Sequence, residues 1–170
     1  MFVLRVARKT TEKEINIMKK ILDACCGSRM FWFDKTNPLV EFCDIRSESH
    51  ILCDGRKLEV KPDTLHDFRK MSFADNSFKL VVFDPPHLVK LGKNSWMAKK
   101  YGVLSENWQQ DIAAGFAECW RVLEKDGILV FKWNERDVPI KEIIKLIGHE
   151  PLFGHTTKSG GFTIWMCFMK

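Results

Sequence analysis

The sequence predicts an α/β fold, in which a doubly wound, mainly parallel sheet carries helices and an antiparallel pair of strands at its C-terminal edge. Short apolar segments alternate along the chain with amphipathic ones, which is the pattern of a parallel sheet crossed by helices. Four of these segments end in an acid, namely Asp23, Asp44, Asp67 and Asp84. The last two apolar runs flank Gly160-Gly161, which favours a tight hairpin turn.

The first half of the chain is expected to hold three strands. Residues 20–24 (KILDA), 39–44 (LVEFCD) and 63–68 (DTLHDF) are short apolar runs that end in turn residues. After the first of them, Gly27 predicts a tight turn that opens a helix near Ser28.

The second half contains the clearest elements. Residues 79–84 (KLVVFD) form the strongest strand pattern, bounded by Asp-Asn and Pro-Pro pairs. Residues 106–123 show apolar positions at steps of three and four, which predicts an amphipathic helix ended by Asp126-Gly127. Residues 128–133 read as another buried strand and residues 138–147 as a helix, followed by the hairpin.

Length and composition indicate one folded domain over residues 1–170. The chain has 170 residues, 45% of them hydrophobic, and a net charge of +5. Residues 1–20 are expected to be an N-terminal extension, where Thr11 and Glu14 have the spacing of a capping box. No membrane span and no signal peptide is evident, so we expect a soluble, cytoplasmic protein without a membrane partner.

The six cysteines favour reduced thiols in or near the core. No Cys-x-x-Cys pair is present, and four of the six lie in apolar segments. A zinc site formed by Cys43, His50 and Cys53 is the alternative, but these residues lack a recognised ligand spacing. We therefore expect no metal.

The stretch LDACCGSR, residues 22–29, predicts a ligand site at the end of the first strand. Gly27 lets the backbone pass close to a ligand, and the turn offers free amide groups. Because the motif is not GxGxxG, it favours a smaller ligand than a dinucleotide, with a nucleoside and a charged tail. Asp44 follows Gly27 by 17 positions, as a ribose-binding carboxylate would; the alternative is a turn residue at a strand end.

Cations and aromatic residues alternate after the Pro-Pro pair, in a loop over residues 86–106. Such a loop suits a phosphate backbone with bases to stack on, and it could close over a substrate as a lid. The alternative is a solvated loop anchored by two rings. The candidate substrate-binding residues are Lys90, Lys93, Trp96 and Tyr101.

From residue 20 to residue 170 the chain resembles class I S-adenosylmethionine-dependent methyltransferases. The resemblance is carried in order by LDACCGSR, FCDIR, HDFRKMSFADNSFKLVVFD, DPPH and the terminal hairpin. It implies a Rossmann-like, seven-stranded sheet in a three-layer arrangement, with S-adenosylmethionine as cofactor. DPPH further resembles the DPPY-type motif of enzymes that methylate exocyclic amino groups of nucleic-acid bases.

The resemblance implies a role for each matching position. Asp23 to Gly27 would approach the methionine part of the cofactor, Asp44 would hold the ribose, and Ile45 would pack on the adenine. Asp67 and the Phe68 amide would contact the adenine edge, with Asp63 or Asp75 as alternatives to Asp67. The implied cofactor-binding residues are Asp23, Ala24, Cys25, Gly27, Asp44, Ile45, Asp67 and Phe68.

The same resemblance assigns the acceptor amine to Asp84, Pro85, Pro86 and His87. The Asp84 carboxylate and the Pro85 carbonyl could accept the two hydrogens of the amine, while the prolines keep both acceptors in place. His87 departs from the usual large aromatic residue. Its imidazole could stack on a base, bind a phosphate or polar acceptor, or bond only its own loop.

The favoured function is methyl transfer to a base amino group in DNA or RNA, most simply adenine. The alternatives are a small-molecule or protein acceptor, and a non-catalytic cofactor-binding partner subunit. The chain shows no added recognition region, so the loop, the chain ends or a protein partner would have to select a nucleic-acid target.

Overall fold

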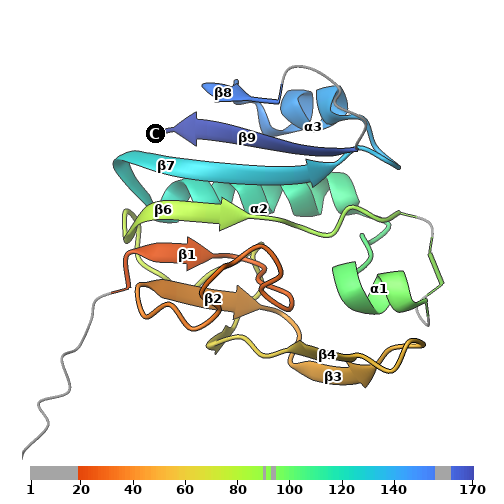
Figure 1. The fold of residues 1–170 in the computed structure, drawn as a ribbon. Helices are drawn as coiled ribbons and strands as arrows, with labels where there is room; N and C mark the ends of the chain where they lie inside the picture. Colours follow the sequence, from red (N-terminus) through yellow and green to blue (C-terminus); the bar gives the residue numbers. More distant parts are fainter. Residues whose placement is uncertain (1–18, 90, 93–94, 156–161) are drawn as a thin grey trace, which may run out of the picture.

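The computed structural model describes residues 19–155 and 162–170, except for residues 90, 93 and 94. Its centre is a seven-stranded sheet in the order β5-β2-β1-β6-β7-β9-β8 (Figure 1). The strands are β1 (Ile21–Asp23), β2 (Val40–Asp44), β5 (Thr64–Leu65), β6 (Phe78–Phe83), β7 (Leu123–Asn134), β8 (Phe153–Gly154) and β9 (Thr163–Met169).

The pairing within the sheet confirms the expected topology. β1 lies parallel to both β2 and β6, and β7 lies parallel to β6. β9 runs antiparallel to both β7 and β8. The predicted mainly parallel sheet with an antiparallel C-terminal hairpin is therefore confirmed, while the predicted turn at Gly160-Gly161 lies outside the described residues.

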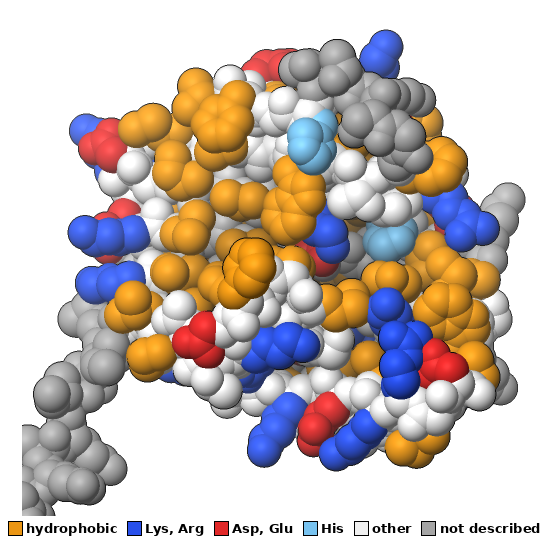
Figure 2. Space-filling model, in the orientation of Figure 1, with side chains coloured by type: hydrophobic (Ala, Val, Ile, Leu, Met, Phe, Trp, Pro, Cys, Tyr) orange, Lys and Arg blue, Asp and Glu red, His pale blue; other side chains and the backbone are white. Residues whose placement is uncertain are grey.

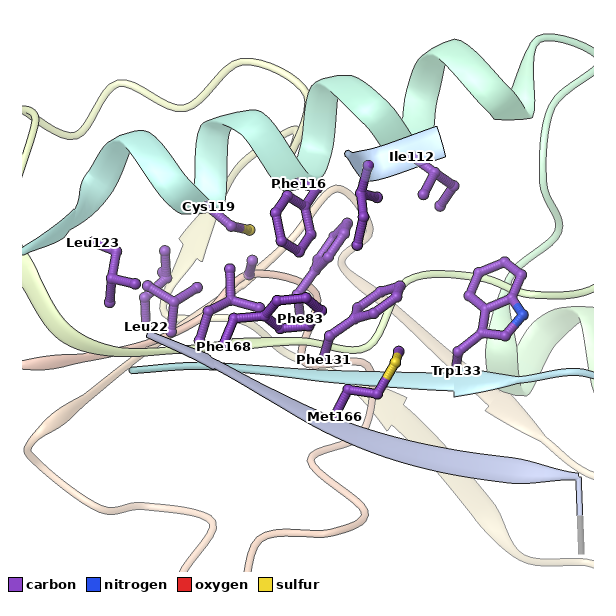
Figure 3. Packing of buried hydrophobic residues seen from close by; sticks show 14 of the residues in the cluster. Leu22, Phe83, Ile112, Phe116, Cys119, Leu123, Phe131, Trp133, Met166 and Phe168 are labelled. Atoms are coloured by element: carbon purple, nitrogen blue, oxygen red, sulfur yellow. The ribbon is translucent and has the colours of Figure 1, made fainter. Parts of the chain in front are cut away.

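Two helices cover one face of the sheet, the face turned away from the viewer in Figure 1. They are α2 (Trp108–Val122) and α3 (Ile140–Ile147), which confirm the two predicted helices with slightly shorter bounds. α2 turns Ile112, Phe116 and Cys119 toward the sheet, as its apolar periodicity predicts (Figure 3). Its terminal charges, Asp111 and Arg121, have the signs that stabilise the helix dipole.

Aromatic rings fill the space between α2 and the sheet (Figure 3). The Phe116 ring meets the Phe168 ring edge to face at 5.2 Å, and the Phe83 and Phe131 rings stack at 5.4 Å between centroids. Both geometries are favoured by aromatic quadrupoles. β6, β7 and β9 are thereby held in one rigid core behind the edge at which the parallel strands end.

The helix predicted to open at Ser28 is absent, because residues 24–38 form a series of turns. Gly27 and Arg29 have φ values of +50° and +54°, which a right-handed helix cannot contain. The Arg29 side chain holds this loop by donating to the Lys35 carbonyl at 2.5 Å and to Asp63 at 2.7 Å. Trp32 then packs edge-on against Phe42 at 5.2 Å.

This loop therefore lies on the sheet face opposite α2. No helix among the described residues lies on that face. Among the described residues, this loop lies where a helical layer was expected on that side of the sheet. Figure 2 shows many hydrophobic side chains on this face, which is the one facing the viewer. Phe153 and Met169 point to it by their register in β8 and β9 and are 66% and 51% exposed.

Two further elements lie beside the sheet. β3 (Glu48–Ile51) and β4 (Lys57–Val60) form an antiparallel hairpin where no strand was predicted. The predicted loop over residues 86–106 contains a short helix, α1 (Trp96–Tyr101). The Ser95 side chain accepts a hydrogen bond from the Met97 amide and so caps the start of α1.

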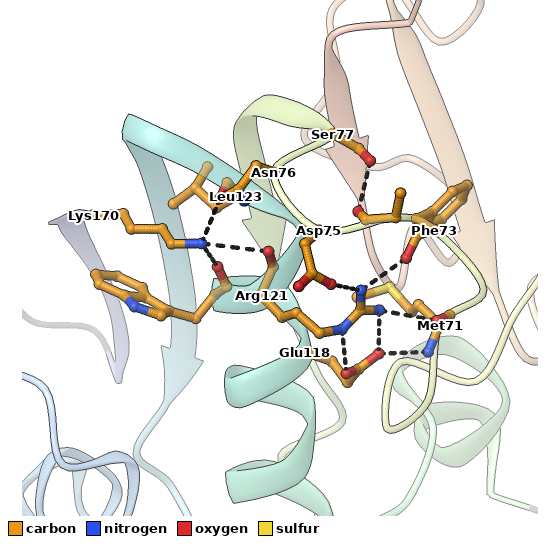
Figure 4. A network of polar contacts seen from close by, with 11 residues as sticks. Met71, Phe73, Asp75, Asn76, Ser77, Glu118, Arg121, Leu123 and Lys170 are labelled. Atoms are coloured by element: carbon orange, nitrogen blue, oxygen red, sulfur yellow. Dashed lines mark hydrogen bonds and ion pairs between the residues drawn. The ribbon is translucent and has the colours of Figure 1, made fainter.

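A polar network joins α2 to the segment that precedes β6 (Figure 4). Arg121 donates to both carboxylate oxygens of Glu118 and to the carbonyls of Met71 and Phe73. Lys170 Nζ donates to the carbonyls of Trp120 and Leu123 at 2.7 Å, which satisfies acceptors at the end of α2. These contacts hold the end of α2 at the edge of the sheet opposite the strand-end acids.

The cysteines and the chain ends complete the comparison with expectation. All six cysteines are free thiols. Among the described residues no group of His, Cys, Asp and Glu side chains is placed to hold a metal, with Cys43 buried and Cys53 exposed. The predicted N-terminal extension, with the capping-box pattern of Thr11 and Glu14, lies outside the described residues for all but its last two positions. None of the described helices has the length and apolar character needed to cross a bilayer.

Candidate functional site

Three acids end adjacent parallel strands at one edge of the sheet. Asp23 ends β1, Asp44 ends β2, and Asp84 directly follows β6. Because β1 pairs with both β2 and β6, these carboxyl ends meet at the same edge, where ligands bind in open α/β sheets. Asp67 lies two residues beyond β5, farther out along that edge.

A cleft opens at this edge, with about 590 Å³ of empty space when the solvent at its mouth is included. The loop after β1 forms one wall, the end of β2 and Phe68 form another, and the Asp84–His87 turn with the end of α1 completes it. Ten predicted site residues line the cleft: Cys25, Gly27, Asp44, Ile45, Phe68, Asp84, Pro85, Pro86, His87 and Tyr101. Most of the residues that line the cleft were therefore predicted from the sequence, although they come from distant segments of the chain.

Asp44 fixes the shape of the cleft floor. Its side chain is almost fully buried, and Oδ2 accepts a hydrogen bond from the Gly27 amide at 2.9 Å. Oδ1 accepts from the Arg46 amide at 2.9 Å and from Arg46 Nε at 3.2 Å. Oδ1 therefore uses both of its lone pairs, while Oδ2 keeps one, so Asp44 can still accept one hydrogen bond from the cleft.

Arg46 extends this arrangement to the other side of the cleft. Its Nη1 donates to the Lys99 carbonyl at 2.9 Å and approaches Glu48 at 3.2 Å. Lys99 belongs to α1, the short helix that also carries Tyr101. A single side chain therefore connects the acid at the end of β2 with the helix beside His87. The sequence reasoning did not single out Arg46.

Asp23 lies behind the cleft wall and is fully buried. It accepts hydrogen bonds from Trp32 Nε1 at 2.7 Å and from the Cys25 amide at 3.4 Å. Burial raises the pKa of Asp23 to about 7, against the lowering effect of the Trp32 bond, with nearby Asp84 and Asp44 adding to the rise. Its neighbour Ala24 is also buried and does not line the cleft.

Asp84 is ion-paired with a residue that the sequence reasoning missed. Lys132 Nζ, from β7, lies 2.5 Å from Asp84 Oδ2. Burial raises the pKa of Asp84, while the charge and hydrogen bond of Lys132 pull it down. Lys132 is itself held over the rings of Phe31 and Trp165, at 5.4 and 5.6 Å from their centroids. A lysine inside the apolar run ILVFKW was the available signal.

His87 follows the Pro-Pro pair and borders the same cleft. Burial lowers the pKa of His87 to about 4, and the positive charge of Lys132 adds to the effect. The imidazole is therefore neutral near pH 7, so it can stack or hydrogen-bond but carries no charge for an anion. Its ring lies 5.5 Å from the Tyr101 ring, centroid to centroid, at a tilt of 55°.

Several predicted residues lie elsewhere. Asp67 does not line the cleft and instead pairs with Arg69, whose guanidinium donates to both of its oxygens and lowers its pKa. Trp96 is 46% exposed at the start of α1, outside the cleft. Lys90 and Lys93 fall outside the described residues.

The comparisons with known proteins point to one fold. No family model matches the chain, and no curated protein matches it. The PH0226 protein of Pyrococcus horikoshii is similar in structure, with a TM-score of 0.56 and 16% identity over 92% of this chain and 84% of that one. A TehB-like SAM-dependent methyltransferase of Corynebacterium glutamicum has a TM-score of 0.53 and 17% identity, covering 90% of this chain and 80% of its own.

A third similar structure is a SAM-dependent methyltransferase of Methanosarcina mazei, with a TM-score of 0.51 and 14% identity over 91% of this chain and 94% of that one. At such identities the likeness shows the fold alone. The strand order, with three parallel strands ending in acids and an antiparallel pair closing the sheet, agrees with it. The chain therefore has the class I fold of the S-adenosylmethionine-dependent methyltransferases.

Proposed function

We propose that this protein is an S-adenosylmethionine-dependent methyltransferase that acts on an exocyclic amino group of a nucleic-acid base. The observation that carries the proposal is the joint placement of two sets of residues in one cleft. Gly27, Asp44 and Ile45 line one part of it, and Asp84 to His87 line another. A nucleoside cofactor and an amine acceptor would thus meet in the same space.

The residues on the cofactor side fit a nucleoside with a charged tail. A Cβ built on Gly27 would meet no atom within 4 Å, so the backbone at this turn borders open space. Asp44 can accept a hydrogen bond from a ribose hydroxyl through Oδ2, and the 59% exposed Ile45 side chain offers an apolar face to a purine. Phe68 adds a second apolar surface to the same cleft.

Fully buried Asp23 would act on the cofactor indirectly. The Asp23 carboxyl orients the loop through Trp32 and the Cys25 amide. A direct contact with the ammonium of the cofactor would require Trp32 to move away. The position of Asp67 beside Arg69 likewise leaves the adenine edge to Phe68 and its backbone.

The acceptor side can hold a weakly nucleophilic amine. S-adenosylmethionine supplies an activated methyl group on a sulfonium, so no metal or covalent nucleophile has to be provided by the chain. Asp84 Oδ1 and the Pro85 carbonyl can accept the two amine hydrogens, while Asp84 Oδ2 stays with Lys132. This orients the nitrogen lone pair toward the methyl carbon. The new N–C bond would form as the C–S bond breaks. The electron pair of the C–S bond would stay on sulfur, and one amine proton would leave to solvent.

Neutral His87 supports an acceptor with a flat ring. An uncharged imidazole beside Tyr101 can lie against a base, as the larger aromatic residue of the DPPY-type motif would. A small-molecule acceptor is the second candidate, and the small face of the His87 ring favours it. A protein partner that selects the nucleic-acid target belongs to the first proposal.

The test measures transfer from methyl-labelled S-adenosylmethionine to single- and double-stranded DNA and RNA and to a metabolite extract. We expect label in nucleic acid with wild-type protein and none with Asp84→Ala. Asp54→Ala, in the exposed turn between β3 and β4, is the matched control and should keep full activity.

Calorimetry with S-adenosylmethionine separates the two halves of the proposal. Asp84→Ala should bind cofactor as well as the wild type, and Asp44→Ala should bind at least about tenfold more weakly, since a buried acceptor is lost. Cofactor binding without transfer to any nucleic acid would refute the base-amine acceptor. No cofactor binding at all would refute the proposed activity.

A further inference from the structure

A second pocket opens beside the cleft, with an empty volume of about 650 Å³. It shares Met30, Asp84, His87 and Tyr101 with the cleft, so a ligand in it reaches the same Asp-Pro-Pro-His turn. The remaining lining comes from the end of β7, the start of β9 and the segments around α1. These elements take no part in the cofactor side of the cleft.

The charge of this pocket is positive. Asp84 is its single acidic lining residue, and Lys132 neutralises it at 2.5 Å. Arg136 is exposed, and within the described part of the chain its guanidinium has no hydrogen-bond or ion-pair partner. Its backbone amide is held in place by Asn134 Oδ1 at 3.1 Å. One acid against two cations leaves a net charge of +1.

Both cations act on the residue that the pocket shares with the cleft. After burial, Lys132 and Arg136 each contribute to the lowered pKa of His87, while Asp137, beside the pocket, opposes them. Their charges are therefore within electrostatic range of the imidazole. An anion attached to a ring that lies against His87 would meet the Arg136 guanidinium, whose fork of donors suits a phosphate or a carboxylate.

The rest of the pocket suits the ring itself. Met30, Leu88, Met97 and Tyr101 provide apolar surface. Methionine side chains adapt to flat ligands of different outline, because they are unbranched and polarizable. Apolar surface on one part of the lining and a cation on another match a planar base that carries an anionic group a short distance away.

We propose that this pocket binds a phosphorylated nucleotide, with its base toward Asp84 and His87 and its phosphate at Arg136. The proposal rests on the function proposed above, since it names the acceptor for the same turn. The phosphate can come from a free nucleotide or from a nucleotide within a strand. Lys132 serves the site by cancelling the charge of Asp84, which would otherwise repel a phosphate.

The test compares adenosine and cytidine with their 5′-monophosphates and with a short single-stranded oligonucleotide. Binding is measured by calorimetry and methyl transfer by label from S-adenosylmethionine. We expect the monophosphates or the oligonucleotide to bind at least about tenfold more tightly than the nucleosides, because a charge-assisted hydrogen bond is gained. Tighter binding of the monophosphate than of the oligonucleotide identifies a free nucleotide, and the reverse order identifies a strand.

Arg136→Gln should abolish this preference while leaving nucleoside binding unchanged. Arg56→Gln, at an exposed arginine in the β3–β4 turn, is the matched control and should preserve it. Equal binding of nucleosides and nucleotides, or a preference that survives Arg136→Gln, would overturn the pocket assignment even if methyl transfer occurs. A phosphate preference that depends on Arg136, without transfer to any ligand, would support the pocket and refute the proposed reaction.

Discussion

At the scale of single residues, the site is governed by how carboxylates at strand ends keep or lose their charge. Asp84 is paired with Lys132, Asp44 accepts three hydrogen bonds, and Asp23 has only two neutral donors. Burial opposes ionisation of Asp84 and Asp23, and of these two only Asp84 has a cation in contact. Neighbouring acids at one sheet edge are therefore expected to behave differently with pH.

Lys132→Met should shift the pH dependence of methyl transfer. Lys132 lowers the pKa of Asp84, so its removal raises that pKa, and more of the carboxyl is protonated at a given pH. Since the amine hydrogens need an ionised acceptor, the acidic limb of the pH–rate profile should move to higher pH. Lys132→Arg keeps a cation and should leave the limb near its wild-type position. An unchanged limb in Lys132→Met would show that the ion pair does not control Asp84.

Asp23→Asn should make stability less dependent on pH. Asp23 has a folded-state pKa of about 7 against an ordinary value of 3.8, so its protonated form favours the folded state. That contribution is complete below pH 3.8 and is lost as the pH rises to about 7, a change of roughly 4 kcal/mol at most. Urea unfolding at pH 5 and pH 8 should show a smaller difference for Asp23→Asn than for the wild type. An equal difference would contradict the assignment.

At the scale of elements, the end of α1 lies close to the Asp84–His87 turn, the proposed acceptor site. Gly102 ends α1 with φ +74°, and a Cβ built there would lie 3.0 Å from Pro86 Cγ. The glycine allows the chain to pass close to the second proline. The placement of Pro86 therefore depends on how α1 ends as well as on β6.

Gly102→Ala should reduce the rate of methyl transfer more than Gly55→Ala does, although both substitutions place alanine at a positive φ. The strained backbone should cost about 1–3 kcal/mol, and the new Cβ should displace Pro86 and lower the rate about tenfold or more. Gly55→Ala, at φ +81° with no atom within 4 Å of its Cβ, imposes backbone strain far from the site. Thermal unfolding and turnover of both variants separate the effects. Equal turnover in the two variants would show that the contact with Pro86 is unimportant.

Which secondary-structure elements could be predicted from the sequence depended on whether their patterns are local. Strands that end in acids and helices with regular apolar spacing were recognised, because their patterns are local. The loop after β1 was not, since the Arg29 side chain, at a residue with left-handed φ, bonds Asp63, which lies 34 residues along the chain, as well as nearby Lys35. The β3–β4 hairpin was missed although its turn contains Asp54-Gly55, a known hairpin signal.

The candidate site divides in a similar way. The cleft residues at strand ends could be predicted, because parallel strands bring their carboxyl ends together. Lys132 and Arg46 could not be assigned, since their roles come from side chains that reach across to Asp84 and Lys99. Position along a strand does not specify such contacts.

At the scale of the whole molecule, the cysteine thiols differ in how accessible they are to solvent. Cys26, Cys43, Cys119 and Cys167 are buried, and Cys53 is exposed in the turn between β3 and β4. Burial also raises the pKa of the Cys26 thiol to about 12 and that of Cys25 well above its ordinary value. A thiolate is the reactive form, so burial makes Cys25 and Cys26 unreactive, whereas Cys53 is accessible to a reagent.

Titration of the native protein with a disulfide reagent at pH 8 should therefore show one fast thiol. Cys53→Ser should remove the fast phase, and unfolding in guanidinium should expose all six cysteines. A fast phase that persists in Cys53→Ser would mean that the cleft opens readily at Cys25.

Arg46 has a consequence for the kinetic order of the proposed reaction. It bonds Asp44 at one end and the Lys99 carbonyl of α1 at the other. A ribose hydroxyl that donates to Asp44 Oδ2 shares one carboxylate with Arg46, which bonds Oδ1, and so acts through Arg46 on the helix that carries Tyr101. We therefore expect sequential addition with the cofactor first, in which S-adenosylhomocysteine inhibits competitively against the cofactor and noncompetitively against the acceptor. In Arg46→Ala this pattern should change to random addition.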